Sequence, residues 1–368
     1  MKRSTTDSLV LKEIEVEGFE KVIVATDDHS GLKAIICIHN TALGPAVGGT
    51  RIHSYPNFEA ALTDVKRLAR GMTYKSALAE VGLGGAKSVI LCNPKNKTHE
   101  LLIAFAEAVD RLQGIYTCAE DVGCTLEDAT LIAKHTPYVV GSASLKGSGN
   151  PSPFTAWGTY RGIQSVLQKM HGSPSVAGKT VAIQGLGSVG GRLAEYLFWE
   201  GAKLILSDID WEKTQRLAKQ FGAMACPAED ILTVACDVLA PCAMGGILNP
   251  QTIPQLKCEA VAGAANNQLL NDSDADLLKQ RGILYAPDFV INAGGLINVS
   301  HEITEDGYCP TRSLAKINTL YDQLLELYAL SEKNNCSTHQ AAVSLGDYRI
   351  QHGIGKRQSP PRYHHRET

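Results

Sequence analysis

The chain has 368 residues, 44% of them hydrophobic, and this length favours two globular domains that each bury a core of their own. Its 35 lysines and arginines stand against 38 acids, and basic residues gather only near the end of the chain, which argues against nucleic acid as a partner. No stretch reaches the roughly 20 apolar residues of a membrane helix, and the polar start is unlike a secretory leader, so we expect a cytoplasmic protein without membrane contact.

Apolar runs and turn signals in residues 8–40 predict that the first domain opens with strands. Residues 57–71 carry apolar side chains at helical spacing, with Pro56 before them and Gly71 at their end, so a helix is expected to lead to Lys75. The patterns that follow predict a strand at 88–92, a helix at 100–112, a short strand at 115–118 and a helix at 125–135. The first half is therefore expected to be an α/β domain.

A turn-rich segment at 149–153 precedes a long helical pattern, and we place a domain boundary near residue 145. From Lys179 onward strands and helices alternate, which predicts a doubly wound parallel sheet. A helical stretch at about 312–334 follows, and the tail at 355–368, with its proline pair and charges, is expected to be frayed.

The ten cysteines show no CxxC pair and no nearby histidine cluster, in a chain too long to need disulfide staples. We therefore expect reduced, mostly buried thiols, with neither disulfides nor a bound metal. The positions are Cys37, Cys92, Cys118, Cys124, Cys226, Cys236, Cys242, Cys258, Cys309 and Cys336.

The segment VAIQGLGSVGGRLAEYL carries Gly185, Gly187 and Gly190 in the spacing GxGxxG, between an apolar strand and a helix. The first glycine permits a tight turn, the second lets the backbone approach a pyrophosphate, and the third allows close helix packing. The anion would lie at the helix N-terminus, beside Ser188 and Val189. The glycines alone would fit a simple turn, but the surrounding strand, helix and second strand favour a dinucleotide site.

Asp208 stands at the end of the second strand, where a carboxylate can accept hydrogen bonds from the adenosine ribose hydroxyls. It would repel a 2′-phosphate, so the predicted cofactor is NAD in preference to NADP. The nearby Arg192 and Lys203 weaken this prediction only slightly.

Lys87 follows the glycines of GLGGAK, Lys75 lies twelve residues upstream, and Asp121 follows the strand predicted at 115–118. A lysine crowded by apolar surface and a second cation loses proton affinity and can serve as a general base. The other lysine could hold a substrate carboxylate while the acid moves protons. Each charge taken alone would be read as a surface residue.

Six segments in order resemble the leucine/phenylalanine/valine dehydrogenase branch of the glutamate dehydrogenase superfamily, over residues of about 10–345. They are GPAVGGTR (44–51), RLARGMTYKSALAEVGLGGAKSVI (67–90), CAEDVG (118–123), GSGNPSPFTAWG (147–158), GLGSVG (185–190) and VINAGGLINV (290–299).

The resemblance implies a substrate-binding and oligomerisation domain at 1–144, completed by the C-terminal helix 331–368, and a Rossmann-type NAD-binding domain at 145–330. It implies homo-oligomers, either octamers or dimers. The segment after Leu345 departs from the family pattern and leaves the assembly open.

The resemblance also assigns roles. Lys87 matches the catalytic lysine that activates water against an imine, Asp121 the proton-relaying aspartate, and Lys75 the lysine that binds the substrate carboxylate. Further matches are Gly48 and Gly49 in the loop against the substrate, Thr155 and Asn292 near the nicotinamide, and Asn267 near the substrate. The reaction implied is the reversible NAD-dependent oxidative deamination of an L-amino acid to a 2-oxo acid and ammonia.

Glutamate enzymes carry a lysine just before the paired glycines, and Val47 stands there in this chain. A buried side-chain carboxylate without a partner costs several kcal/mol, so glutamate is disfavoured. The other pocket positions that the resemblance gives are apolar: Ala119, Leu296 and Val299. We expect a branched-chain, leucine-like substrate, with phenylalanine or tryptophan as alternatives, and with a non-catalytic sensor of NAD or an amino acid as the competing class of function.

Overall fold

The computed structural model describes residues 8–143 and 147–363. The chain divides into two compact units. Unit 1 contains the described parts of 1–150, 299–310 and 349–368, and unit 2 contains 151–298 and 311–348. Each unit holds one six-stranded sheet, so the predicted two-domain α/β fold is confirmed.

The sheet of unit 1 is mixed, with the strand order β1-β2-β3-β5-β4-β6. The first three strands are antiparallel, β5 is antiparallel to β3 and parallel to β4, and β4 is parallel to β6. The strands are β1 (Leu9–Ile14), β2 (Lys21–Asp27), β3 (Leu32–Asn40), β4 (Ala46–His53), β5 (Gly84–Leu91) and β6 (Tyr116–Glu120). The carboxyl ends of the parallel strands β4, β5 and β6 therefore meet at one edge.

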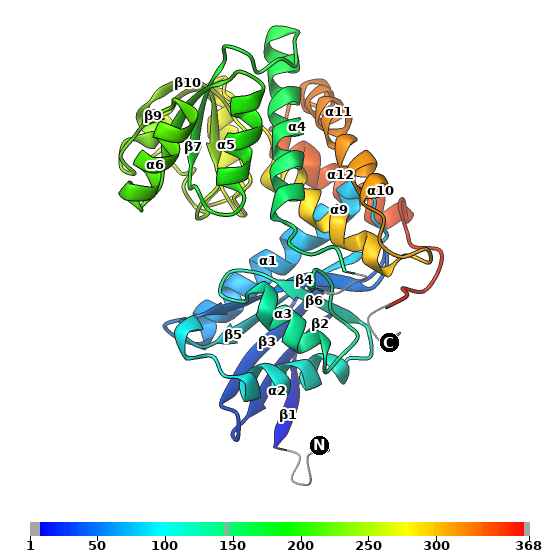
Figure 1. Ribbon diagram of the computed structural model, residues 1–368. Coiled ribbons are helices and arrows are strands. Elements are labelled where there is room, and N and C mark those ends of the chain that lie inside the picture. Colours follow the sequence, from blue (N-terminus) through cyan, green and yellow to red (C-terminus); the bar gives the residue numbers. More distant parts are fainter. Residues whose placement is uncertain (1–7, 144–146, 364–368) are drawn as a thin grey trace. The chain divides into compact units, whose positions relative to one another are not determined.

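Helices cover both faces of this sheet (Figure 1). Helix α1 (Phe58–Ala79) packs on one face, and α2 (His99–Asp110) and α3 (Leu126–Ala133) pack on the other, while the short η1 (Pro94–Asn96) precedes α2. The predicted helix at 57–71 is too short. Gly71 lies inside α1 because the buried residues that follow it outweigh the helix penalty of a glycine, about 1 kcal/mol.

The sheet of unit 2 is parallel throughout, in the order β12-β11-β10-β7-β8-β9. The strand order reverses between β7 and β10, which is where doubly wound sheets bind ligands beyond the carboxyl ends of their strands. The strands are β7 (Thr180–Gln184), β8 (Lys203–Ser207), β9 (Met224–Ala225), β10 (Ala235–Pro241), β11 (Lys257–Val261) and β12 (Leu284–Tyr285).

Three helices after residue 150 have residues assigned to both units, namely α9, α10 and α12. The longer helices are α4 (Ser152–His171), α5 (Gly190–Trp199), α6 (Trp211–Phe221), α7 (Asp274–Gln280), α8 (Asp288–Ile291), α9 (Gly294–Ser300), α10 (Pro310–Asn318), α11 (Leu320–Lys333) and α12 (Thr338–His352). Short 3-10 helices are η2 (Ile231–Thr233), η3 (Ile253–Gln255) and η4 (His301–Ile303).

The division into units differs from the predicted domains. The predicted boundary at 144–145 lies outside the described residues, and the contacts divide after Asn150. The C-terminal helical region belongs to unit 2 as far as Tyr348, because α11 packs on α4 and Thr338 Oγ1 donates to Tyr285 O at 2.6 Å. From Arg349 the chain rejoins unit 1, where the Arg349 guanidinium donates to Leu78 O at 2.8 Å.

The prediction of a frayed tail is wrong for its described part. Arg357 donates from its amide to Leu43 O at 2.9 Å, from Nε to Gly82 O at 3.0 Å and from Nη1 to Ile303 O at 3.1 Å. Tyr363 Oη lies 2.7 Å from Thr117 Oγ1. Prolines and charges in a sequence do not reveal which distant carbonyls will accept their hydrogen bonds, and residues 364–368 lie outside the description.

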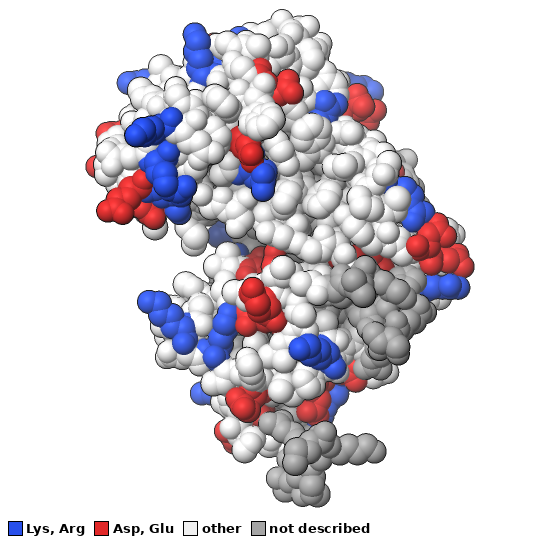
Figure 2. Space-filling model, viewed as in Figure 1, with Lys and Arg blue, Asp and Glu red and all other residues white. Residues whose placement is uncertain are grey.

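The described helices include none with the length and apolarity needed to cross a membrane. On the face drawn in Figure 2, cationic and anionic side chains are interspersed, as the near balance of charges suggests.

Candidate active site

A buried ion pair joins the two predicted catalytic residues. Lys87 lies on β5 and is 4% exposed, and Asp121 directly follows β6. Lys87 Nζ donates to Asp121 Oδ1 at 2.6 Å. The parallel arrangement of β4, β5 and β6 thus brings together residues that are 34 positions apart in the chain.

The paired glycines of β4 make room for this ion pair. A Cβ atom on Gly49 would lie 2.6 Å from Glu120 O, 2.9 Å from Asp121 Cβ and 3.1 Å from Lys87 Nζ. A Cβ on Gly48 would lie 1.7 Å from the carbonyl oxygen of Ala86. Both positions therefore require glycine on packing grounds alone.

A buried hydroxyl network fixes these strands to one another. Tyr116 Oη donates to Gly48 O at 2.8 Å and lies 2.9 Å from Ser88 Oγ, which donates to Thr50 Oγ1 at 3.0 Å. The three side chains come from β6, β5 and β4. The network holds the glycine strand in register with the strand that carries Lys87.

Charges around the pair set its protonation. Burial lowers the pKa of Lys87, and the guanidinium of Arg51 lowers it further, against the opposing effect of the Asp121 carboxylate. Burial alone would raise the pKa of Asp121, but Lys87 and Arg51 outweigh it and hold that pKa at about 2. At neutral pH Asp121 is therefore a carboxylate, and Lys87 gives up its proton more readily than an ordinary lysine.

The other predicted residues of unit 1 lie on the same elements. Lys75 is half-buried on α1, which approaches β5 so closely that a Cβ on Gly85 would lie 2.1 Å from Thr73 N. Lys75 lies two residues after Thr73 on α1, and Lys87 lies two residues after Gly85 on β5. Val47 is buried on β4. Ala119 is half-buried on β6 and pairs with Gly49.

Three residues that the sequence analysis missed form a chain of hydrogen bonds that ends on Asp121. Arg51 Nε donates to Asp121 Oδ2 at 3.0 Å, and Arg51 Nη1 donates to Asp64 Oδ2 at 2.9 Å. Tyr55 Oη donates to the same oxygen of Asp64 at 2.6 Å. The two-residue period of a strand was the available signal, because it places Arg51 on the same face of β4 as Gly49.

The cysteines beside the acid are inert thiols. Burial raises the pKa of Cys118 to about 12, and burial also raises the pKa of Cys124. Both stay protonated at physiological pH and act as small buried hydrophobic side chains. All ten cysteines are free.

In unit 2 the glycine loop connects β7 to α5. Gly185 has a φ of +91°, and a Cβ there would lie 2.7 Å from Ala243 Cβ. A Cβ on Gly190 would lie 1.9 Å from Gly185 O, whereas a Cβ on Gly187 would meet nothing within 4 Å. The fold itself thus explains the outer two glycines, and Gly187 leaves open space where a pyrophosphate could approach the backbone.

Asp208 follows β8 and is tied to this loop. Its Oδ2 accepts from Leu186 N at 2.7 Å, and its Oδ1 accepts from Asp210 N at 3.0 Å. Burial alone would raise the pKa of Asp208, but these amide hydrogen bonds and the ammonium of Lys213 outweigh it and lower the pKa. A cavity of about 350 Å³ lies alongside, lined among others by Gly187, Ser188 and Lys213. Val189 is the residue before α5, so the loop ends at a helix N-terminus.

Asn292 is 4% exposed, and its Nδ2 donates to Asn266 Oδ1 at 2.7 Å. Its Oδ1 is buried without a hydrogen-bond partner among the described residues, so this acceptor is unsatisfied. The predicted Asn267 has a φ of +51°, and its carbonyl accepts from Gly246 N at 2.7 Å. Asn266, which the sequence analysis did not name, directly precedes it.

The last predicted residues lie on α4 and α9. A Cβ on Gly295 would lie 2.5 Å from Thr155 Oγ1, so the start of α9 touches α4 at the predicted nicotinamide-binding threonine. Leu296 is 7% exposed and Val299 is 5% exposed. Leu296 belongs to unit 2 and Val299 to unit 1.

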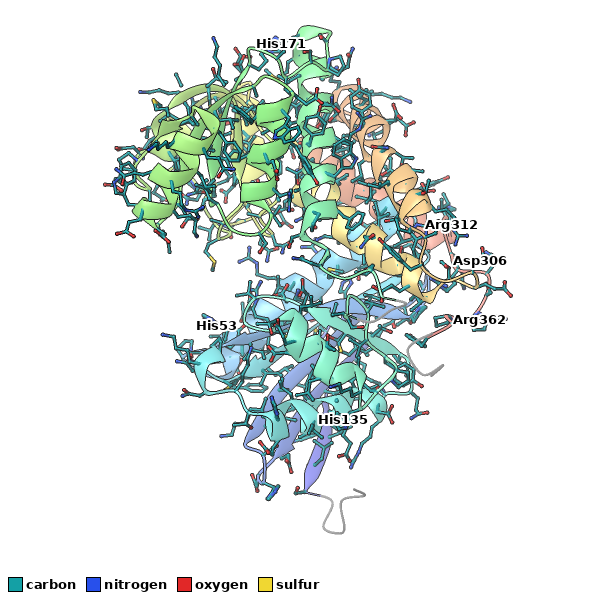
Figure 3. All side chains as sticks on the ribbon, in the orientation of Figure 1. His53, His135, His171, Asp306, Arg312 and Arg362 are labelled. Carbon is teal, nitrogen blue, oxygen red and sulfur yellow. The ribbon has the colours of Figure 1, made fainter. Side chains whose placement is uncertain are left out.

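One group of side chains in unit 2 has the composition of a metal site. The ligand atoms of His171, Asp237 and Glu259 lie within 4.8 Å of one another, and Figure 3 shows His171 at the end of α4. Both oxygens of Asp237 are already used, one by Lys179 Nζ at 3.2 Å and the other by Thr180 N at 2.7 Å. We assign no metal to this group.

Comparison with known proteins places these residues in context. Residues 18–138 match the family described as Glu/Leu/Phe/Val dehydrogenase, dimerisation domain, and residues 206–350 match Glutamate/Leucine/Phenylalanine/Valine dehydrogenase. Leucine dehydrogenase of Geobacillus stearothermophilus is 47% identical over 93% of this chain and 93% of its own length. Phenylalanine dehydrogenase of Caldalkalibacillus thermarum is 44% identical over 92% of each chain.

The crystal structure of L-tryptophan dehydrogenase from Nostoc punctiforme superposes with a TM-score of 0.77 at 42% identity, covering 91% of this chain and 96% of that one. Matches to both halves of the chain, together with these identities, confirm the resemblance drawn from the motifs. The chain belongs to the Glu/Leu/Phe/Val dehydrogenase family and is an amino acid dehydrogenase of its Leu/Phe/Val branch, an oxidoreductase that acts on CH–NH₂ donors.

Proposed function

We propose that the protein catalyses the reversible NAD-dependent oxidative deamination of a branched-chain, leucine-like L-amino acid. The amino acid, NAD⁺ and water yield the 2-oxo acid, ammonium, NADH and a proton. The observation that carries the proposal is the buried Lys87–Asp121 pair, with Nζ and Oδ1 2.6 Å apart and packed directly against Gly49.

Residues of unit 2 fit the dinucleotide. Gly187 leaves the backbone accessible, Ser188 and Val189 lead into the N-terminus of α5, and Asp208 is held as a carboxylate that can accept from ribose hydroxyls. The free Oδ1 of Asn292 suits the amide group of the nicotinamide, and Thr155 is a second candidate for contact with that group. When bound, the nicotinamide supplies the acceptor for the hydride that leaves the substrate Cα.

The residues of unit 1 would handle protons and orientation. Lys75 holds the substrate carboxylate as an ammonium. Asp121 accepts a proton from the substrate amino group and returns one to the departing ammonia. Lys87, which burial makes easier to deprotonate, takes a proton from the water that attacks the imine carbon. Gly48 and Gly49 keep the substrate close to this pair.

The residue types at the predicted pocket positions favour an apolar side chain. Val47, Leu296 and Val299 are buried and apolar, and Ala119 is small and half-buried. None of them offers a cation to a glutamate side-chain carboxylate, and burying that carboxylate without a partner costs several kcal/mol. The leucine dehydrogenase relative supports a branched-chain substrate, and the phenylalanine and L-tryptophan dehydrogenases make an aromatic substrate the second candidate.

Asp208 favours NAD over NADP, because its carboxylate would repel a 2′-phosphate. The match to a dimerisation domain supports a homo-oligomer, either a dimer or an octamer. All ten cysteines are free thiols, which fits the reducing environment of the cytoplasm.

A substrate panel tests the proposal. The protein is incubated with NAD⁺ and L-leucine, L-valine, L-phenylalanine, L-tryptophan or L-glutamate at alkaline pH, and NADH formation is followed by absorbance. We expect the highest kcat/KM with L-leucine and none with glutamate. Lys87→Ala should lower kcat by about 10²–10⁴-fold while NADH still binds. Absence of NADH with every amino acid would leave a non-catalytic sensor as the better reading.

A further inference from the structure

Asp121 is held from two opposite sides. Lys87 Nζ reaches Oδ1 at 2.6 Å, and Arg51 Nε reaches Oδ2 at 3.0 Å. The Arg51 side chain is 17% exposed and that of Asp121 is 13% exposed, so water screens this contact weakly. Each carboxylate oxygen therefore has one cationic donor, and the carboxylate plane is fixed.

A second acid anchors Arg51 from behind. Arg51 Nη1 donates to Asp64 Oδ2 at 2.9 Å, and Tyr55 Oη donates to the same oxygen at 2.6 Å. The Tyr55 ring packs edge-on against His53, with centroids 5.0 Å apart, at the end of β4 where Figure 3 labels His53. Asp64 lies on α1 and Arg51 on β4, so the anchor joins two elements of the site.

We propose that Arg51 is the positioning residue of the Lys87–Asp121 pair: it fixes Asp121 through Oδ2 and supplies a permanent positive charge that lets Lys87 release its proton. The inference rests on the proposed function. Lys87 must cycle between ammonium and amine, whereas a guanidinium keeps its charge throughout. While Lys87 is neutral, Asp121 would be a buried carboxylate without a counter-ion if Arg51 were absent, and such a charge costs several kcal/mol. Without Arg51, the Asp121 carboxylate would therefore hold Lys87 in its charged, protonated form.

Other charged groups face the pair from the neighbouring elements. Arg51 on β4 favours the neutral form of Lys87, and the carboxylates of Asp121 and Asp64 favour its charged form. Burial raises the pKa of Glu120 on β6, and Asp121 adds to this. Lys75 on α1 is a further cation of unit 1, besides Lys87 and Arg51. Because Arg51 and Asp64 carry opposite charges, removing each should shift the deprotonation of Lys87 in opposite directions. A purely structural role would not predict opposite shifts.

The test uses the full-length protein without cofactor or amino acid. Lys87 is labelled competitively with acetic anhydride across a pH series, and mass spectrometry of the peptide that contains it gives the pH at which the amine becomes reactive. Arg51→Gln should move this onset to higher pH, because a positive charge is lost. Asp64→Asn should move it to lower pH, because a negative charge is lost. Arg51→Lys should keep the onset near that of the wild type.

Kinetics provide the second readout. Arg51→Gln should lower kcat at neutral pH by about 10-fold or more, with a smaller change in KM, since Lys75 rather than Arg51 anchors the substrate. Arg51→Lys should lower kcat as well, because one ammonium cannot span both Asp121 and Asp64. The matched control is Arg111→Gln, which removes an arginine of unit 1 that directly follows α2 and whose ion pair is with the partly exposed Glu107 and not with Asp121 or Asp64. It should change neither readout.

Two results would overturn the proposal: an onset in Arg51→Gln that equals that of Arg111→Gln, or shifts of the same sign in Arg51→Gln and Asp64→Asn. Should Arg51→Gln fail to fold, as judged by circular dichroism, Asp64→Asn and Arg51→Lys still decide between the outcomes. Labelling requires no turnover, so a wild-type protein that oxidises no amino acid would refute the proposed function while the charge coupling is measured independently.

Discussion

At the scale of single residues, the Lys87–Asp121 pair depends on the absence of a Cβ atom at position 49. Gly49 faces the Lys87–Asp121 pair with no Cβ, and a methyl group there would enter the van der Waals radius of both side chains. The glycine is therefore a requirement of the ion pair.

Gly49→Ala should lower kcat strongly and destabilise unit 1 by about 1–3 kcal/mol, because the added Cβ must displace Glu120 O or Asp121. Steady-state kinetics and denaturant unfolding measure the two effects. The matched control is Gly71→Ala in α1, where a Cβ meets nothing within 4 Å. That change should stabilise by about 0.5–1 kcal/mol. Equal behaviour of the two variants would contradict the steric role of Gly49.

At the scale of elements, the C-terminal segment after α12 acts as a strap across unit 1. Arg357 binds the loop before β4 through Leu43 and the loop before β5 through Gly82, and it binds η4 through Ile303. These two loops lead directly into the strands that carry Gly49 and Lys87.

Arg357→Ala should lower the free energy of unfolding by about 1–3 kcal/mol, since the side-chain hydrogen bonds to Gly82 O and Ile303 O are lost. Urea unfolding monitored by circular dichroism measures this. Lys356→Ala, at the exposed neighbouring position, should cost less than about 0.5 kcal/mol. Indistinguishable midpoints for the two variants would show that the strap adds no stability.

Sequence reasoning succeeded where the determining interactions are local. The glycine loop, its strand and Asp208 lie within 29 positions of one another, from Thr180 to Asp208, and hydrophobic period alone indicates their elements. It failed where partners are distant: the partner of Arg51 is 70 positions away in Asp121, and Arg357 contacts a carbonyl 275 positions away. The end of α1 was missed for the same reason, because packing on β5 outweighs the local signal of Gly71.

At the scale of the whole molecule, the match to a dimerisation domain predicts a particle heavier than one chain. Sedimentation equilibrium should give a particle of at least twice the 39.5 kDa chain, at a dimer or octamer value. A single 39.5 kDa species at micromolar concentration would contradict assembly. The measurement is independent of catalysis, so it tests the partner prediction without reference to substrate.

The discontinuity of unit 1 affects how the protein is made. Its strands emerge first from the ribosome, yet Arg349 and Arg357 are translated only after all of unit 2. Domains that are continuous in sequence can fold one after another during synthesis. Here unit 1 cannot form the contacts of Arg349 and Arg357 until all of unit 2 has been synthesised. Nascent chains halted before residue 349 should therefore carry a loosely closed first domain beside a mature second one, and they would be the species most exposed to chaperones.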